Sequence, residues 1–287
     1  MATESRDEPT PGTLYVVATP IGNLEDITER ARRVLGEAEL VLAEDTRRVR
    51  TLLSAMNVST PVESYHGDTH PDKRARLIDR LASGAVMALA SDAGTPALSD
   101  PGATLVREAA ERGVRIVPVP GASAVTAALS ASGLPAHRFE FAGYPPRRED
   151  QRRQFLARLV ASPVTSVFFE APHRLRDCLA DLQEVAGPEQ PVIICRELTK
   201  LHEEILRTTV AGAIERFAGQ QPRGELSVLL PPGEDHDEHA LDEAALRDAG
   251  CRLLDAGIST RDAADLLSEL TGRGRNELYD LLLELRG

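Results

Sequence analysis

Three short segments of the chain combine glycine with small and polar residues, a composition that lets the backbone approach a bound ligand. They are VATPIGN (17–23), SDAGTP (91–96) and PGASA (120–124), and each directly follows a predicted strand. Open α/β sheets bind ligands beyond the carboxyl ends of their strands, where small residues leave main-chain N–H and C=O groups accessible. The pattern therefore favours binding of a cofactor or substrate, although each segment taken alone is also compatible with an ordinary turn.

None of the three segments has the spacing of a common nucleotide-binding loop. The chain contains no GxxxxGK[ST] motif, and the first segment has Ala18 and Pro20 where a GxGxxG motif requires glycine. A conventional ATP or NAD site is therefore not indicated.

Composition limits the class of protein. The 287 residues carry a formal net charge of -12, which argues against non-specific coating of nucleic acid but not against a local basic patch. Cys178, Cys195 and Cys251 lie far apart, so neither a disulfide framework nor a zinc site is expected, and a reducing cytoplasm fits best. We expect no membrane span, because no apolar run reaches about 18 residues. The polar residues 1–12 lack the apolar core of a signal peptide.

The segments that must position these loops alternate between strand-like and helix-like patterns. Continuous apolar strands separated by helices predict α/β sheets covered on both faces. In the first half the predicted strands are LYVVATP, ELVLAED, VMALASD and VRIVPVP, and in the second half they are FEFAGY, TSVFFEA, PVIICRE and ELSVLLP. Helices of the second half are expected to begin near Arg148, Pro172 and Thr209.

We expect four parts along the chain. They are a disordered lead-in (1–12), an N-terminal α/β domain (13–119), a C-terminal α/β domain (120–233) and a helical tail (234–287). In the tail, Ser259 and Asp262 form a predicted capping pair for the middle of three helices. In the LSDPG segment, Asp100 is expected to cap a helix whose first turn contains Pro101.

In their order along the chain, seven motifs resemble those of the tetrapyrrole-methylase superfamily of S-adenosylmethionine-dependent methyltransferases. They are LYVVATPIGNLEDIT, LVLAEDTR, ALASDAGTPALSDPG, PVPGASA, FFEAPHR, CRELTKLHEE and RGELSVLL. The resemblance covers roughly residues 13–233 and is greatest to the bacterial 16S ribosomal RNA cytidine 2′-O-methyltransferases, which carry TPIGN as their first loop. The tail also resembles the helix-turn-helix unit of that branch.

The resemblance implies a fold and a cofactor. The fold is α/β, with two α/β domains of the tetrapyrrole-methylase type, a cleft between them for S-adenosylmethionine, and a small C-terminal helical, helix-turn-helix-like unit. The residues that it implies at the cofactor are Ile21, Asp92, Gly94, Thr95, Ser123, Ala124, Phe169, Glu197 and Leu226. The hydroxyl of Ser123 could instead satisfy its own helix N-terminus, and Phe169 could simply pack in the core.

The implied reaction is methylation of a cytidine ribose, cytidine 1402, in 16S ribosomal RNA. A 2′-hydroxyl is a poor nucleophile, so it must be aligned with the methyl group and must lose its proton. Glu170 and Lys200 are the leading catalytic candidates, ahead of Glu44, Asp45, His66 and Glu203. The residues assigned to RNA are Arg47, His66, Tyr144, Arg174 and Arg196, where arginine suits phosphate and tyrosine suits stacking on an unpaired base. Several of these charged residues could instead form ion pairs between the two halves.

Alternatives remain for the function and for two segments. A tetrapyrrole or other small-molecule methylase of the same fold, and a ligand-sensing helix-turn-helix regulator, are the rival functions. The arginine-rich segment 145–159 is either a solvated helix face or an RNA-facing flap, and the acidic terminal helices are either an RNA-binding module or a lid. The resemblance implies a homodimer, with small-subunit ribosomal RNA as partner, without metal or membrane.

Overall fold

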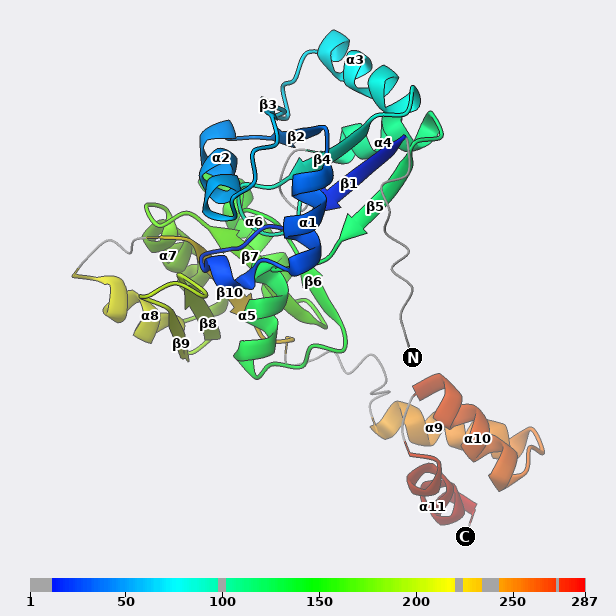
Figure 1. The fold of residues 1–287 in the computed structure, drawn as a ribbon. Coiled ribbons are helices and arrows are strands. Elements are labelled where there is room, and N and C mark those ends of the chain that lie inside the picture. The colour runs from blue at the N-terminus through cyan, green and yellow to red at the C-terminus, as the bar shows by residue number, and fades with distance from the viewer. Residues whose placement is uncertain (1–11, 98–101, 220–223, 234–242, 272–273, 287) are drawn as a thin grey trace.

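The computed structural model describes residues 12–97, 102–219, 224–233, 243–271 and 274–286. Two five-stranded sheets form the main body, and three helices form a C-terminal unit (Figure 1). The residues expected to form the lead-in up to Pro11, Asp100 and Pro101 of the LSDPG segment, and the acidic residues 234–242 lie outside the described part of the chain.

The first sheet is entirely parallel, in the order β3-β2-β4-β1-β5. Its strands are β1 (Thr13–Val17), β2 (Leu40–Ala43), β3 (Val62–Ser64), β4 (Val86–Ala90) and β5 (Arg115–Val119). Val17 pairs with both Ala90 and Val119, and Ala90 also pairs with Ala43, so these strands end at one edge. The loops that follow them are therefore brought together, as the sequence pattern predicts.

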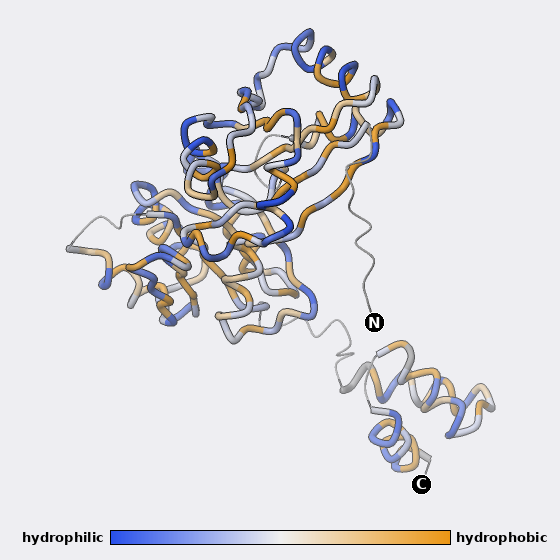
Figure 2. The backbone as a smooth tube through the Cα atoms, in the orientation of Figure 1, coloured by the Kyte–Doolittle hydropathy of each residue, from blue (hydrophilic) through white to orange (hydrophobic). Residues whose placement is uncertain are grey.

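Amphipathic helices cover both faces of this sheet with their apolar sides. The helices of the first half are η1 (Leu24–Asp26), α1 (Glu29–Glu37), α2 (Thr46–Ala55), α3 (Pro71–Ala82) and α4 (Ala103–Glu111). Alternate strand residues point to opposite faces, so Tyr15 packs in one buried cluster with α1 and α2 while Leu14 packs in another with α3 and α4. Figure 2 shows the hydrophobic residues running along the strands, with polar residues on the outer turns of the helices.

The second sheet is mixed, in the order β6-β7-β10-β8-β9, and only β6 and β7 pair in parallel. Its strands are β6 (Phe139–Phe141), β7 (Thr165–Glu170), β8 (Pro191–Arg196), β9 (Glu204–Thr209) and β10 (Leu226–Leu230). Its helices are α5 (Ala124–Ser132), α6 (Glu149–Val160), α7 (Leu175–Ala186) and α8 (Val210–Phe217). Val125 and Leu129 of α5 share a buried cluster with Val167 and Ile193 of this sheet, and Ile21 from the first half joins it.

The C-terminal unit has its own small core. Its helices are α9 (Glu243–Asp255), α10 (Thr260–Thr271) and α11 (Arg275–Arg286), with Leu246, Leu267, Leu278 and Leu282 buried among them. The predicted capping pair is confirmed, since the Ser259 hydroxyl donates to Asp262 Oδ2 at 2.7 Å and accepts the Asp262 N–H at 3.1 Å. No described helix is long and apolar enough to cross a membrane.

Candidate functional site

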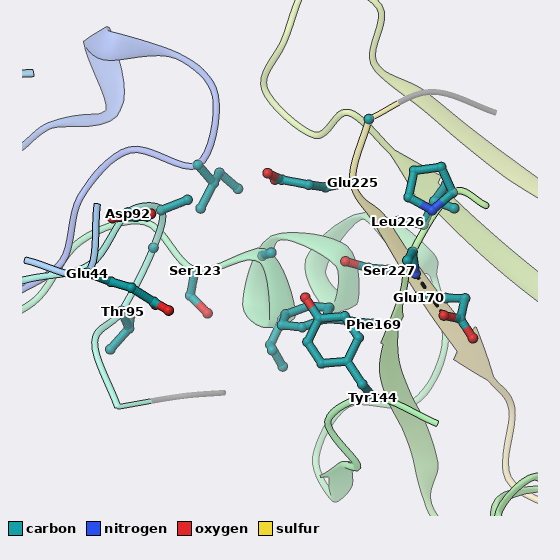
Figure 3. Close-up of a pocket in the computed structure, with 18 of the residues that line it drawn as sticks. Glu44, Asp92, Thr95, Ser123, Tyr144, Phe169, Glu170, Glu225, Leu226 and Ser227 are labelled. Carbon is teal, nitrogen blue, oxygen red and sulfur yellow. Dashed lines mark hydrogen bonds between the residues drawn. The ribbon is translucent and has the colours of Figure 1, made fainter. Parts of the chain in front are cut away.

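A cavity of about 620 Å³ lies between loops of the two halves. The first half contributes the segments that follow β1, β2 and β4, and the second half contributes the segments that follow β6 and β7 and the start of β10 (Figure 3). The lining residues are Ile21, Glu44, Asp45, Arg48, Asp92, Ala93, Gly94, Thr95, Ser123, Ala124, Val125, Tyr144, Phe169, Glu170, Ala171, Pro172, Gly224, Glu225, Leu226 and Ser227. Eight of the nine residues predicted at the cofactor are among them, and Glu197 is the exception.

The loops after β1 and β4 are joined by backbone hydrogen bonds. The Thr19 N–H donates to the Gly94 carbonyl at 2.9 Å, and the Gly94 N–H donates to the Thr19 carbonyl at 3.0 Å. Gly94 has a φ of +80°, and a Cβ there would meet Ile21 Cγ2 at 3.2 Å. The backbone conformation and the close approach of the two loops therefore both favour glycine at this position.

Asp92 connects the loop after β4 to the loop after β2. Its Oδ1 accepts the Asp45 N–H at 2.9 Å. Asp45 in turn caps α2 by accepting the N–H groups of Arg47 and Arg48, and the Arg47 N–H is the main reason that the pKa of Asp45 lies below its usual value. Asp92 thus lies at the cavity and also holds together the two loops that line it.

The start of α5, which follows the loop after β5, forms another part of the cavity wall. Ser123 makes no side-chain capping bond to α5, so the alternative of a self-satisfied helix terminus is wrong. Figure 3 shows its side chain directed into the space between the two groups of lining residues. Thr95 Oγ1 donates to the Ala122 carbonyl at 3.4 Å, which ties the loop after β4 to this helix start.

Two aromatic rings form the wall on the side of the second sheet. The Phe169 ring lies 4.8 Å from that of Phe141 and 5.6 Å from that of Tyr144, measured between centroids. Phe169 therefore packs in the core and lines the cavity at once. Tyr144 is 55% exposed and reaches the same cavity.

Glu170 ends β7, and its side chain is completely buried. Its Oε1 accepts the Ala171 N–H at 2.8 Å and lies 3.5 Å from Arg174 Nε, while Oε2 has no hydrogen-bond partner in the described part of the chain. Burial raises the pKa of this carboxyl, and the Ala171 N–H and Arg174 oppose the rise. The carboxylate is thus enclosed by protein and is not presented to the cavity, although Glu170 is one of the residues of the cavity wall.

The difference in the free energy of unfolding between Glu170→Gln and the wild type is expected to shift in favour of the variant as the pH rises. The pKa of Glu170 is higher in the folded state than the value of about 4.3 typical of an unfolded chain, so between the two values the folded state binds more protons. The free energy of unfolding of the wild type then falls as pH rises, whereas glutamine does not titrate. Urea unfolding of both proteins between pH 4 and pH 8 measures the difference, and a difference independent of pH would contradict this prediction.

Glu197 and Lys200 lie beside the cavity and do not line it. Lys200 Nζ donates to Glu197 Oε1 at 2.8 Å and lies 3.7 Å from Glu225 Oε2, and Glu197 Oε1 also accepts the Glu225 N–H at 3.2 Å. Burial opposes the ionisation of Glu197, but these bonds outweigh it, so the pKa of Glu197 lies below its usual value. The pair therefore fixes Gly224 and Glu225, which do line the cavity.

The residues predicted to contact RNA are not gathered in one place. Tyr144 lines the cavity, and Arg47 lies at the start of α2 beside the lining residue Arg48, with 89% of its side chain exposed. His66 is exposed and lies outside the lining. Arg196 donates to Glu204 at 3.0 Å, but this ion pair joins β8 and β9 of one sheet and does not connect the two halves.

Arg174 is also committed within the protein. Its Nη2 donates to the carbonyls of Pro145 and Pro146 at 2.7 and 2.9 Å. Sequence reasoning did not assign Arg48, Glu225 or Ser227 to the site, although all three line it. Glu225 immediately follows Gly224 and directly precedes β10, which is the signal that would have found it.

All three cysteines are free, and burial raises the pKa of the Cys195 thiol to about 11. Among the described residues, no group of three or more His, Cys, Asp or Glu side chains is placed to hold a metal ion.

Comparison with known proteins gives two family matches. Residues 13–214 match the tetrapyrrole (corrin/porphyrin) methylases, and residues 241–286 match the RsmI C-terminal HTH domain. Proteins named ribosomal RNA small subunit methyltransferase I are similar along almost the whole chain. The one from Xylella fastidiosa is 42% identical and the one from Pseudomonas aeruginosa 44%, with 94% and 96% of this chain covered and 98% of each relative.

Solved structures of low sequence identity share the fold of the main body. Cobalt precorrin-4 methyltransferase has a TM-score of 0.58 at 21% identity, covering 77% of this chain and 95% of that one. Uroporphyrin-III C-methyl transferase from Thermus thermophilus, complexed with S-adenosyl homocysteine, has a TM-score of 0.53 at 23% identity, covering 77% and 97%.

Proposed function

The chain belongs to the tetrapyrrole (corrin/porphyrin) methylases, and we propose that it methylates the ribose 2′-hydroxyl of cytidine 1402 in 16S ribosomal RNA. Similarity over nearly its whole length to ribosomal RNA small subunit methyltransferase I makes it an S-adenosylmethionine-dependent ribosomal RNA methyltransferase. That similarity, which extends through the C-terminal unit, is the observation that carries the proposal. The tetrapyrrole alternative has support from the family match and the fold, but not from the relatives that are similar along almost the whole chain.

The residues of the cavity fit S-adenosylmethionine. Its volume lies in the range of about 300–1,000 Å³ usual for ligand sites. The lining carries Glu44, Asp45, Asp92 and Glu225 but only one basic side chain among the described residues, Arg48. This surplus of carboxylates favours a ligand with a positively charged sulfur. When bound, S-adenosylmethionine supplies an electrophilic methyl group on that sulfur.

We propose that main-chain groups near Gly94 and Ser123 hold the cofactor, with Ile21 and Leu226 as apolar cover for its purine. Asp92 and Thr95 keep the surrounding loops in place through their bonds to Asp45 and Ala122. Alignment of the 2′-hydroxyl with the methyl group then accounts for much of the rate, because it converts a bimolecular step into one between held groups.

The proton of the 2′-hydroxyl needs an acceptor that faces the cavity. Glu44 and Glu225 are exposed lining residues, and Figure 3 shows their carboxylates directed toward the space between the two halves. The enclosed carboxylate of Glu170 and the ammonium of Lys200, which contacts Glu197 and Glu225, are less suited to this step. We therefore propose Glu44 or Glu225 as proton acceptor in place of Glu170 and Lys200.

Transfer of a labelled methyl group tests the function. Small subunits from cells that lack the activity are incubated with the protein and methyl-labelled S-adenosylmethionine, and we expect label in the 16S ribosomal RNA at cytidine 1402. Subunits reconstituted with 2′-deoxycytidine at that position serve as the control and are expected to remain unlabelled. Absence of label from normal subunits would contradict ribosomal RNA as substrate, and label on the deoxy substrate would contradict the 2′-hydroxyl as acceptor.

The remaining partners are part of the same proposal. Action on small-subunit ribosomal RNA agrees with the names of the relatives, and we propose that it takes place in the cytoplasm. A homodimer agrees with the resemblance to the superfamily. Sedimentation equilibrium of the purified protein measures its oligomeric state.

A further inference from the structure

The loop that carries Tyr144 is held by its carbonyl groups. Pro145 and Pro146 have no backbone N–H, so this part of the loop cannot donate hydrogen bonds to its surroundings. Arg174 Nη2 instead donates to both proline carbonyls, and Arg152 Nη1 donates to the Arg147 carbonyl at 3.2 Å. Two guanidinium groups thus hold three consecutive carbonyls beside the cavity.

Arg174 is itself held by Glu170. Its Nε lies 3.5 Å from Glu170 Oε1, its side chain is only 18% exposed, and the Glu170 side chain is completely buried. A charge in such surroundings is costly without its partner, so each of the two groups fixes the other. The carboxylate also accepts the Ala171 N–H, which fixes it relative to the end of β7.

Tyr144 presents an exposed ring at the end of this chain of contacts. Its ring meets that of Phe169 edge-on, and more than half of the residue remains exposed beside the cavity. Unpaired bases of RNA are commonly bound by stacking on such rings, which contributes about 1–3 kcal/mol per base.

We propose that Glu170 and Arg174 form a positioning pair that holds Tyr144 as a stacking platform for the target base. The proposal rests on the proposed function for the identity of the base, but the support of the loop by the pair does not depend on it. It assigns to Glu170 and Arg174 a role other than proton transfer and phosphate binding.

Arg174→Gln tests the pair through two measurements. Hydrogen–deuterium exchange is expected to rise at the amides of residues 144 and 147–149, because the loop loses its main anchor. In methylation assays we expect the KM for small subunits to rise roughly tenfold, with kcat and cofactor affinity little changed, since base stacking of this size contributes to substrate binding. Arg174→Lys, which can still contact Glu170 but cannot donate to both carbonyls in the same way, is expected to give an intermediate KM.

Arg176→Gln is the matched control. Arg176 lies two residues further along the chain on α7, and its guanidinium also donates to two consecutive carbonyls, those of Phe217 at 3.0 Å and Ala218 at 2.9 Å. The substitution removes an equivalent pair of bonds at a place that does not line the cavity. We expect no change in KM or in amide exchange at residues 144–149.

A double-mutant cycle with Tyr144→Ala separates positioning from general weakening. If Arg174 acts through Tyr144, the double variant has a KM close to that of Tyr144→Ala alone. Effects that multiply to roughly a hundredfold would show that the two residues act independently and would overturn the proposal. Unchanged exchange in Arg174→Gln would overturn it as well, whether or not the wild type methylates ribosomal RNA, so this failure is distinct from failure of the proposed function.

Discussion

Gly94→Val is expected to weaken the binding of S-adenosylmethionine by roughly a hundredfold and to abolish measurable methyl transfer. Gly94 has a left-handed φ of +80°, and the first carbon of any side chain would already meet Ile21 Cγ2 at 3.2 Å. Ile21 is buried in the cluster between the two halves, so it has little room to move. The branched side chain must therefore displace the joined loops after β1 and β4, which form one wall of the cavity.

Gly113→Val separates this effect from backbone strain. Gly113 also has a positive φ, +75°, but a Cβ there would have no neighbour within 4 Å. Both variants are expected to lose about 1–3 kcal/mol of stability from the strained backbone, as measured by urea unfolding. Calorimetric titration with S-adenosylmethionine should show weakened binding for Gly94→Val only. Equal affinities in the two variants would mean that the loop after β4 does not form the cofactor site.

Much of the fold of the first half could be predicted because the signals of its strands and loops lie within short stretches of sequence. Strands such as VMALA are continuous apolar runs, and their parallel arrangement brings the glycine-rich loops to one edge without knowledge of the rest of the chain. The three-residue strand β3 and the half-buried strand β9 carry no such signal. Helix α3, which begins with Pro71 and is largely polar on its outer face, was likewise not predicted.

The cavity itself depends on contacts that no local pattern contains. Glu225 and Leu226 reach it because β10 runs antiparallel between β7 and β8, so its beginning lies beside the end of β7. Spacing cannot reveal that Glu170 is enclosed or that Arg174 binds proline carbonyls 28 and 29 residues away. The residue types therefore indicated which segments meet at the cavity. The roles of the charged residues became clear only from how their side chains pack in the folded protein.

The packing of the arginine-rich segment 145–159 against α7 could not be predicted from its sequence either. Asp181→Ala is expected to lower the free energy of unfolding by about 3–5 kcal/mol, the usual cost of breaking a buried ion pair. Asp181 on α7 is 3% exposed and accepts from Arg152 Nε at 2.6 Å and from Arg153 Nε at 2.9 Å. Arg152 is itself 7% exposed, so α6 is neither a fully solvated helix nor a separate flap, and the substitution leaves a buried guanidinium without its carboxylate.

Asp150→Ala is the matched control on the surface of α6. Asp150 contacts Arg148 at 3.0 Å, but both side chains are more than half exposed, and such pairs contribute about 0–1 kcal/mol. Chemical unfolding followed by circular dichroism measures both variants. A cost for Asp181→Ala no larger than that for Asp150→Ala would contradict the importance of the buried pair.

The origin of the expected loss can be tested by removing both partners. If the cost of Asp181→Ala comes from the unpaired charge of Arg152, then Arg152→Met combined with Asp181→Leu should recover most of the stability, because apolar side chains of similar volume often replace a buried ion pair at little cost. Arg153 is not left as a buried, unpaired charge in these variants, since 37% of its side chain is exposed and it also contacts Glu149 and Glu184. The double variant also loses the bond from Arg152 to the Arg147 carbonyl. It should therefore regain stability while amide exchange at residues 147–149 rises above that of the wild type, which separates the folding role of the Arg152–Asp181 pair from the support that Arg152 gives to the loop.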